Sequence, residues 1–287
     1  MNLSRVLQQW YSINKRELPF RRTDNPYFIW LSEIILQQTR VEQGLPFYLN
    51  FITTFPKISD LASAEERQVL KLWQGLGYYS RARNLHYSAK YIVKKYNGVF
   101  PAKYEKILDL KGVGPYTAAA ISSFAFGLPY AVVDGNVIRV LSRFFGIETA
   151  FDSAEGKKEY QRLAQSLLDR SNPAENNQAI MEFGAVQCLP AIPRCPSCPL
   201  VADCIAYNTN SVKNLPVRSK RVKVRSRFIH YLFIQHNDCL PLVKREKGIW
   251  KGLYEFPSLE FSTNKPDRLI MSSEIWNIFF ESLDYKI

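Results

Sequence analysis

The sequence lacks the segments that place a protein in a membrane or send it out of the cell. No apolar run approaches the roughly 20 residues that a membrane-spanning helix requires. The first residues lead into an amphipathic helical pattern and not into the apolar core of a signal peptide. Internal repeats and low-complexity tracts are absent as well. We therefore expect a cytoplasmic protein.

Acidic residues are few relative to basic ones. The chain holds 26 Asp and Glu against 38 Lys and Arg, which gives a formal net charge of +12 and indicates a polyanionic partner or an acidic surface. With 46% hydrophobic residues it is globular and not disordered, and 287 residues can bury one large or two ordinary cores. This balance is compatible with a nucleoid-associated protein.

Cysteine is also scarce, but its placement is informative. Four of the five cysteines fall in one proline-rich segment with the spacing C-x6-C-x2-C-x5-C, at Cys188, Cys195, Cys198 and Cys204. Disulfides are unexpected without an export signal, which leaves tetrahedral zinc or a 4Fe–4S cluster. Zinc modules typically use two C-x2-C pairs, and only one is present here. We expect the fifth, Cys239, to be a small apolar residue.

Strand-like alternation is missing from the chain up to Cys204, so this part is predicted to be helical. We expect Leu18–Arg22 to be extended, Asn25 and Pro26 to start a helix, and Ser63 to Glu66 to form a capping box. The other expected helices cover residues 4–13, 80–96, 104–110, 136–145, 154–169 and 173–184, with one more opening at Pro115.

The pattern changes after residue 208. Residues 209–227 carry seven basic residues and no acid, and are predicted to be a linker that is either solvated or lies on DNA. Two strands, Phe228–Gln235 and Cys239–Val243, are expected to form a hairpin through residues 236–238. One helix should follow over Ser272–Leu283. The predicted domains are thus 1–208 and 228–287.

A glycine turn between two short helices is the most distinctive local feature. Gly112, Val113 and Gly114 separate the helix 104–110 from the helix that begins at Pro115, so that residues 104–126 form a helical hairpin. Unpaired amides in the turn and at the start of the second helix can hold a phosphate, while Val113 fills the space between the helices. The alternative is an ordinary αα-hairpin whose glycines only make a turn.

Two carboxylates and a tyrosine pair complete the set of candidates. Glu33 lies on a largely apolar helix, and Asp134 follows an apolar run at the start of another. Tyr78 and Tyr79 follow a Gly-Leu-Gly turn and precede Arg81 and Arg83, a pattern compatible with a wedge that enters a base stack beside phosphate-binding cations. Taken alone, Glu33 is more simply interpreted as a half-exposed residue on the edge of an amphipathic helix. Taken alone, the two tyrosines are as readily interpreted as core residues.

Together these stretches resemble the A/G-specific adenine DNA glycosylases, the MutY family, within the helix-hairpin-helix superfamily that includes endonuclease III. The resemblance covers nearly the whole chain up to Leu259. The motifs that carry it are WLSEIILQQT from Trp30, GLGYYSRARNL from Gly75, LKGVGPYTA from Leu110, VVDGN from Val132 and the four-cysteine segment.

The resemblance implies a mainly α, two-lobed glycosylase domain with a 4Fe–4S cluster held by the four cysteines. It implies hydrolysis of the N-glycosidic bond of adenine mispaired with 8-oxoguanine or guanine in double-stranded DNA, by a monomer. Glu33 would be the general acid and Asp134 the ionised carboxylate that stabilises the developing sugar cation, with Tyr116 and Asn136 orienting them. Gln38 and Tyr78 would fill or wedge the duplex, and Arg81, Arg83 and the glycine turn would bind DNA.

Tyr116 also separates this chain from its bifunctional relatives, which resemble endonuclease III and carry a nucleophilic lysine at the matching position. We therefore expect a monofunctional glycosylase. The alternatives are an endonuclease III-like glycosylase and lyase, a non-catalytic iron–sulfur DNA-binding protein and an unrelated zinc protein.

The segment from Gly248 to Pro257 resembles the start of the family's Nudix-like C-terminal domain, without the glutamate-rich box of Nudix hydrolases. The family pattern continues with further strands and a Ser/His loop that reads 8-oxoguanine. We therefore expect a partial α+β domain after the helical one, packed loosely, and weaker discrimination between 8-oxoguanine and guanine opposite adenine.

Overall fold

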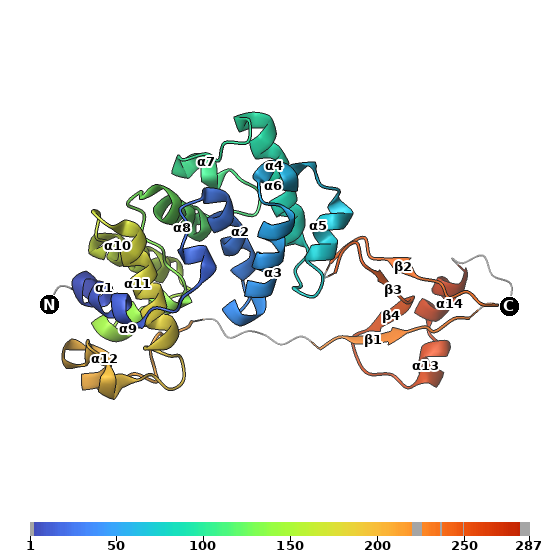
Figure 1. The fold of residues 1–287 in the computed structure, drawn as a ribbon. Helices are drawn as coiled ribbons and strands as arrows, with labels where there is room; N and C mark the ends of the chain where they lie inside the picture. Colours follow the sequence, from blue (N-terminus) through green and yellow to red (C-terminus); the bar gives the residue numbers. More distant parts are fainter. Residues whose placement is uncertain (1–2, 220–225, 236, 249, 282–287) are drawn as a thin grey trace. The chain divides into compact units, whose positions relative to one another are not determined.

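The computed structural model describes residues 3–219, 226–235, 237–248 and 250–281, and divides the chain into two compact units, Met1–Lys220 and Arg221–Ile287 (Figure 1). Among its described residues, all regular secondary structure of the first unit is helical. No helix among the described residues is long and apolar enough to cross a membrane.

The first unit begins with α1 and ends with a short helix after the cysteine segment. Its helices are α1 (Leu3–Asn14), η1 (Pro19–Arg21), α2 (Pro26–Leu36), α3 (Val41–Thr54), α4 (Ile58–Ser63), α5 (Glu66–Leu72), α6 (Ser80–Tyr96), α7 (Tyr104–Leu108), α8 (Pro115–Phe126), α9 (Gly135–Phe145), α10 (Ala154–Leu167), α11 (Pro173–Val186), η2 (Cys195–Ser197), η3 (Val201–Asp203) and α12 (Ile205–Asn208).

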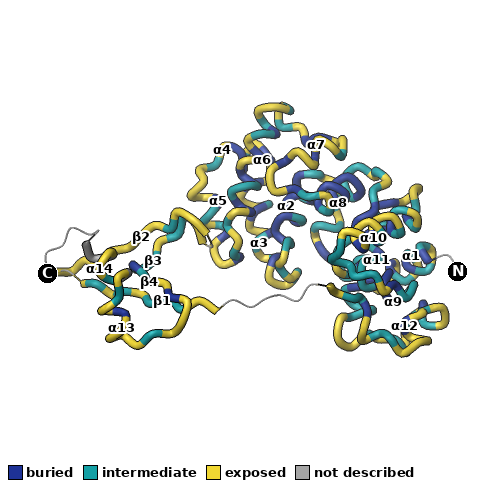
Figure 2. Tube along the Cα trace, turned by 180° about the vertical axis from the view of Figure 1, so that it is seen from behind, coloured by how far each residue is buried: buried dark blue, intermediate teal, exposed yellow. Residues whose placement is uncertain are grey.

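Two large hydrophobic cores divide the described part of this unit into two lobes, and a third, much smaller cluster includes residues of α8. The first core is built by the helices from α2 through α8 and contains the fully buried Trp30 and Trp73. The second core is built by α1, α9, α10 and α11 and contains Tyr160 and Phe183. Helix α2 packs against α3, α6 and α8 (Figure 1). It is dark along most of its length in Figure 2, because its sequence is apolar on nearly every side. The expected two-lobed, mainly α architecture is confirmed.

Most expected helix starts are confirmed, and two local predictions are wrong. The Asn25 side chain accepts a hydrogen bond from the Tyr27 amide and caps α2, with Pro26 at the first helical position. The capping box before α5 is formed by Glu65 and Gln68, because Ser63 instead ends α4, a helix that the sequence pattern did not reveal. The segment expected to be extended contains the 3-10 turn η1.

Two small antiparallel sheets are present in the described part of the second unit. Its elements are β1 (Phe228–Tyr231), β2 (Val243–Lys244), β3 (Tyr254–Glu255), β4 (Ser258–Phe261), α13 (Asp267–Met271) and α14 (Glu274–Glu281). The expected hairpin is wrong: β1 pairs with β4, and β2 pairs with β3. Apolar alternation identifies strand-forming segments but does not specify their partners. Residue 236 of the expected turn and Leu283 at the expected helix end lie outside the described residues.

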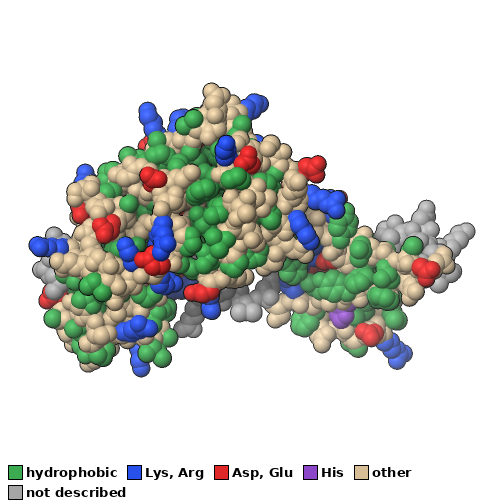
Figure 3. Space-filling model, in the orientation of Figure 1, with side chains coloured by type: hydrophobic (Ala, Val, Ile, Leu, Met, Phe, Trp, Pro, Cys, Tyr) green, Lys and Arg blue, Asp and Glu red, His purple; other side chains and the backbone are tan. Residues whose placement is uncertain are grey.

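The core of this unit is small. Leu259, Phe261 and Ile270 are buried, with Leu232 and Trp276 packed against them. Hydrophobic side chains gather on the face of the unit that Figure 3 shows, and several large ones are more than half exposed, among them Phe233, Trp250 and Tyr254. Few apolar residues are therefore available to hold these strands together.

Candidate active site

Both candidate carboxylates line one cavity of about 220 Å³ between the two lobes. Glu33 comes from α2 in the first lobe, and Asp134 stands at the start of α9 in the second. Tyr116, near the start of α8, lines the same cavity together with Asn136. The structure thus brings together all four residues that the sequence marked as the catalytic group.

Glu33 has the environment of a proton donor. The pKa of its carboxyl is raised from the usual 4.5 to about 7, mainly by burial and to a smaller extent by the nearby charge of Asp134. A hydrogen bond with Tyr116 acts in the opposite direction, as does the positive charge of Arg21. Burial also raises the pKa of Tyr116 well above its usual value, so its hydroxyl keeps its proton. A carboxyl group with a pKa near 7 can donate a proton at neutral pH.

Asp134 has the environment of a hydrogen-bond acceptor. As the N-cap of α9, its Oδ1 accepts from the backbone amides of Asn136 at 2.9 Å and Val137 at 2.8 Å. Its Oδ2 accepts from the Asn136 side-chain amide at 2.7 Å. Burial raises the pKa of Asp134 above 3.8, and these three hydrogen bonds oppose that rise. Since all three donors point at lone pairs, they favour the ionised form.

Arg139 extends this arrangement towards the cysteine segment, and no sequence feature had pointed to it. Its Nη2 donates to Asn136 Oδ1 at 2.8 Å and to the Gly184 carbonyl at 2.6 Å, while its Nε donates to the Cys188 carbonyl at 2.7 Å. One guanidinium therefore connects the residue that holds Asp134 to the end of α11. A basic residue one turn into α9 is too common in helices to stand out.

A second ionic group on the cavity wall was also missed. Glu182 of α11 is fully buried and forms 2.7 Å ion pairs with both Arg16 and Arg21, which lower its pKa to about 2 despite its burial. Phe20 lies on the same wall. The sequence could have indicated this group, because Glu182 is a carboxylate among the apolar residues of α11. Its partners Arg16 and Arg21 both lie in the segment before α2.

The glycine turn has the expected shape only in part. Gly112 has a φ of +86°, which favours glycine, whereas Gly114 has an extended φ of −100°. A Cβ at Gly112 would meet Asn84 at 2.9 Å, but one at Gly114 would meet nothing within 4 Å. Val113 is buried between the helices, as predicted. No steric contact within the folded chain therefore requires glycine at position 114.

The two wedge candidates lie at the mouth of the cavity. Gln38 and Tyr78 line a second, wider hollow of about 560 Å³ whose wall also includes Tyr116 and Asp134. Both are exposed, Tyr78 to 65%. Their position would allow contact with a bound duplex on the side from which the carboxylates are reached.

The two arginines after the tyrosine pair differ from each other. Arg83 is partly exposed and forms a 3.3 Å ion pair with Glu66. Arg81 is buried, with only 9% of its surface exposed, and its guanidinium donates to backbone carbonyls. The expected phosphate-binding role of Arg81 therefore does not fit its position, because the guanidinium is turned into the protein. Sequence position alone could not separate two arginines that lie two residues apart.

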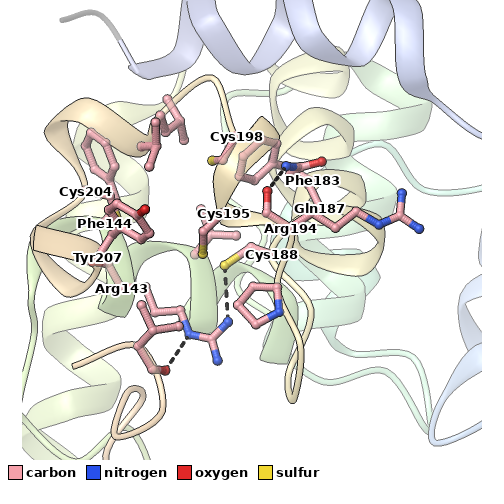
Figure 4. Close-up of a pocket in the computed structure, with 15 residues that line it drawn as sticks. Arg143, Phe144, Phe183, Gln187, Cys188, Arg194, Cys195, Cys198, Cys204 and Tyr207 are labelled. Carbon is pink, nitrogen blue, oxygen red and sulfur yellow. Dashed lines mark hydrogen bonds between the residues drawn. The ribbon is translucent and has the colours of Figure 1, made fainter. Parts of the chain in front are cut away.

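All four cysteines of the 188–204 segment line one cavity beside Phe183 and Arg143 (Figure 4). Arg143 Nη1 lies 3.4 Å from Cys188 Sγ, and burial raises the pKa of the Cys198 thiol to about 11. Within the described ranges, no three His, Cys, Asp or Glu side chains are close enough to hold a single metal ion. The four thiols nevertheless share one cavity, which is the arrangement that ligands of a common centre require.

Comparisons with known proteins agree on one family. Residues 31–170 match the family model described as HhH-GPD superfamily base excision DNA repair protein. The adenine DNA glycosylase of Buchnera aphidicola subsp. Acyrthosiphon pisum is 36% identical over 273 residues, which cover 94% of this chain and 77% of that protein. The adenine DNA glycosylase of Mus musculus is 42% identical over a match that covers 88% of this chain and 59% of the relative.

Solved structures are similar over the helical unit. A thermostable thymine-DNA glycosylase superposes with a TM-score of 0.67 at 29% identity, covering 72% of this chain and 95% of its own. The similarity thus extends over nearly the whole of that enzyme.

Proposed function

The chain belongs to the family of adenine DNA glycosylases, and from this premise we propose that it removes adenine mispaired with 8-oxoguanine or guanine from double-stranded DNA. The observation that carries the proposal is the pair of carboxylates in one cavity. Glu33 has a pKa of about 7, and Asp134 accepts three hydrogen bonds. Because one chain supplies both carboxylates, we propose that it acts as a monomer on nucleoid DNA.

The reaction follows from the different environments of the two groups. Adenine is a poor leaving group, so Glu33 donates a proton to a ring nitrogen as the N-glycosidic bond breaks. The sugar then develops oxocarbenium character, and the ionised Asp134 stabilises this positive charge. Tyr116 orients Glu33 through their hydrogen bond, and Asn136 fixes Asp134. Water completes the hydrolysis.

Adenine has to leave the base stack before it can reach the cavity. Tyr78 and Gln38 enter the duplex at the cavity mouth, while the backbone of the 112–114 turn binds a phosphate. Arg83 adds a cation close to the DNA. The Glu182 ion pairs with Arg16 and Arg21 present fixed polar groups to the extruded base. Their fixed charges would require little rearrangement when the base arrives.

We propose that Cys188, Cys195, Cys198 and Cys204 hold a 4Fe–4S cluster. The support is the cavity that all four thiols line, together with the resemblance of their spacing to that of the family's cluster. Such a cluster would cross-link the loop after α11 to α12, close to the Arg139 contacts. Arg143, which donates to the Leu189 and Pro190 carbonyls, would hold the loop's backbone in place.

We also propose that the chain does not cleave the DNA strand efficiently. Tyr116 occupies the position of the lysine nucleophile in bifunctional relatives. The described residues that line either cavity include no lysine at all. A Schiff base with the sugar needs such an amine.

The test is incubation with a duplex that carries adenine opposite 8-oxoguanine, scored for abasic sites and for nicks before and after alkali. We expect abasic sites without nicks until alkali is added, and no efficient covalent adduct when borohydride is present. Nicking as fast as base release would favour the endonuclease III-like alternative. Binding without any base release would favour a non-catalytic iron–sulfur protein.

A further inference from the structure

Gln38 and Tyr78 both adopt a backbone conformation that their side chains disfavour. Their φ angles are +56° and +47°, in the left-handed region that glycine or asparagine usually occupies. Gln38 is the third residue of a tight turn closed by a 3.2 Å hydrogen bond from the Thr39 amide to the Leu36 carbonyl. Unfavourable conformations of this kind persist only where surrounding contacts impose them.

The side chain of Arg81 makes such contacts on both sides. Its Nη1 lies within hydrogen-bond distance of the Ile34, Ile35 and Gln37 carbonyls and of Thr39 Oγ1. These groups belong to the end of α2 and to the turn around Gln38. The carbonyls at a helix end have no partner within the helix, so a buried cation is well placed to satisfy them.

On its other side, Arg81 holds the turn that contains Tyr78. Its Nη2 donates to the Leu76 and Gly77 carbonyls, each at 3.4 Å, and its own amide donates to the Tyr78 carbonyl at 2.9 Å. The guanidinium carbon also lies 5.2 Å from the Trp73 ring centre and 5.7 Å from that of Tyr78. One side chain thus joins two loops that lie 40 residues apart in the sequence.

We propose that Arg81 is a positioning residue that holds Gln38 and Tyr78 in the geometry that extrudes the target base. The inference rests on the proposed function, since it assigns the step that precedes bond cleavage. Lysine cannot replace arginine here, because its single ammonium group cannot satisfy carbonyls on two loops at once.

The experiment separates base extrusion from chemistry. Extrusion is measured with 2-aminopurine, a fluorescent base placed opposite guanine at the target position, whose fluorescence increases when it leaves the stack. The increase is compared between Glu33→Gln protein and Glu33→Gln protein that also carries Arg81→Lys. Chemistry is measured as the single-turnover excision rate of adenine opposite guanine, over a range of pH, in proteins that retain Glu33. Thr39→Val, which removes one acceptor without changing the shape of the side chain, is a milder second variant. Arg67→Lys, at an exposed position on α5, is the matched control.

We expect Arg81→Lys to lower the fluorescence increase and the excision rate together. The expected effect is roughly tenfold if one of the two residues leaves its left-handed conformation. Thr39→Val should act in the same direction by less, and Arg67→Lys should have no effect. The pH dependence of the rate should keep its shape, because Glu33 is untouched.

Three results would overturn the inference. One is an unchanged rate in folded Arg81→Lys, as judged by circular dichroism. A second is a slower rate with a full fluorescence increase, and a third is a shifted pH profile, which would place the effect at Glu33. Wild-type protein that releases no adenine would instead overturn the proposed function, and the fluorescence comparison would still report on Arg81.

Discussion

At the scale of single residues, the proposed reaction rests on two carboxylates with different surroundings. Glu33→Gln and Asp134→Asn should each lower single-turnover excision by about 10²–10⁴-fold, because each removes a positioned proton donor or a charge. Both should fold, since glutamine can still accept from Tyr116 and asparagine is as good an N-cap as aspartate. Quench-flow or gel assays at saturating enzyme measure the rates. A variant that excises at nearly the wild-type rate would show that its carboxylate is not catalytic.

The raised pKa of Glu33 also affects stability. Its folded-state pKa of about 7 lies above the unfolded value near 4.5, so the unfolded chain loses this proton first as the pH rises. Glu33 therefore costs stability progressively between about pH 4.5 and 7, by up to about 3 kcal/mol at higher pH. Glu33→Gln should become more stable relative to wild type across this window. Urea denaturation at pH 4, 6 and 8 measures the difference, which should stay constant if the pKa is ordinary.

Gly114 allows the phosphate contact to be tested without disturbing the fold. A methyl group there would meet no protein atom within 4 Å and no strained φ, so Gly114→Ala should fold normally. The added methyl would instead occupy the space that a phosphate needs to reach the backbone. We expect weaker binding of matched and mismatched duplexes alike, by fluorescence anisotropy. A change confined to the mismatched duplex would argue against a phosphate contact.

At the scale of elements, the cavity exists because three helix ends meet. Helix α2 presents Glu33 from the first lobe, α8 adds Tyr116 from the hairpin, and α9 begins at Asp134 in the second lobe. The Gln37 side-chain amide donates to Thr117 Oγ1 at 3.2 Å and so joins α2 to α8. The end of α11 approaches α9 so closely that a Cβ at Gly184 would lie 2.6 Å from that of Asn136. Small shifts of one element should therefore be transmitted to the site.

The cysteine segment is the element most open to test. Cys198→Ser should lose iron and the visible absorbance of the cluster, and the second lobe should unfold at a lower temperature. Iron content, the absorption spectrum and thermal melting measure these effects. Cys239→Ser, which changes an exposed cysteine outside the segment, is the control. Full iron content in Cys198→Ser would show that the ligand set has been assigned wrongly.

At the scale of the whole molecule, both carboxylates, the glycine turn and all four cysteines of the segment lie in the first unit. A chain that ends at Lys220 should therefore keep single-turnover excision of adenine opposite guanine within a few-fold, while its affinity for DNA falls as basic residues are removed. Excision assays and salt-dependent binding on the two chains measure this. Loss of excision at saturating protein would mean that the second unit contributes to the chemistry.

The sequence by itself predicted most of the helices and marked the candidate residues of the site. Apolar periodicity, Asn25 with Pro26, and the Gly112 turn predict local structure because they depend on neighbouring residues alone. Glu33 and Asp134 stood out as carboxylates in apolar surroundings, and the four-cysteine spacing predicted a metal centre. Each of these signals depends only on residue types and their spacing along the chain.

Only the tertiary structure decided which groups are buried together. Arg81 and Arg83 are alike in sequence, yet one is enclosed by carbonyls of α2 and the other is partly exposed, because helix packing sets their environment. Glu182 forms ion pairs with two arginines that lie more than 160 positions away in the sequence. The pairing of β1 with β4 likewise depends on contacts between distant segments. Burial and long-range pairing arise from the whole fold, and they set the pKa of Glu33 and the place of Arg81.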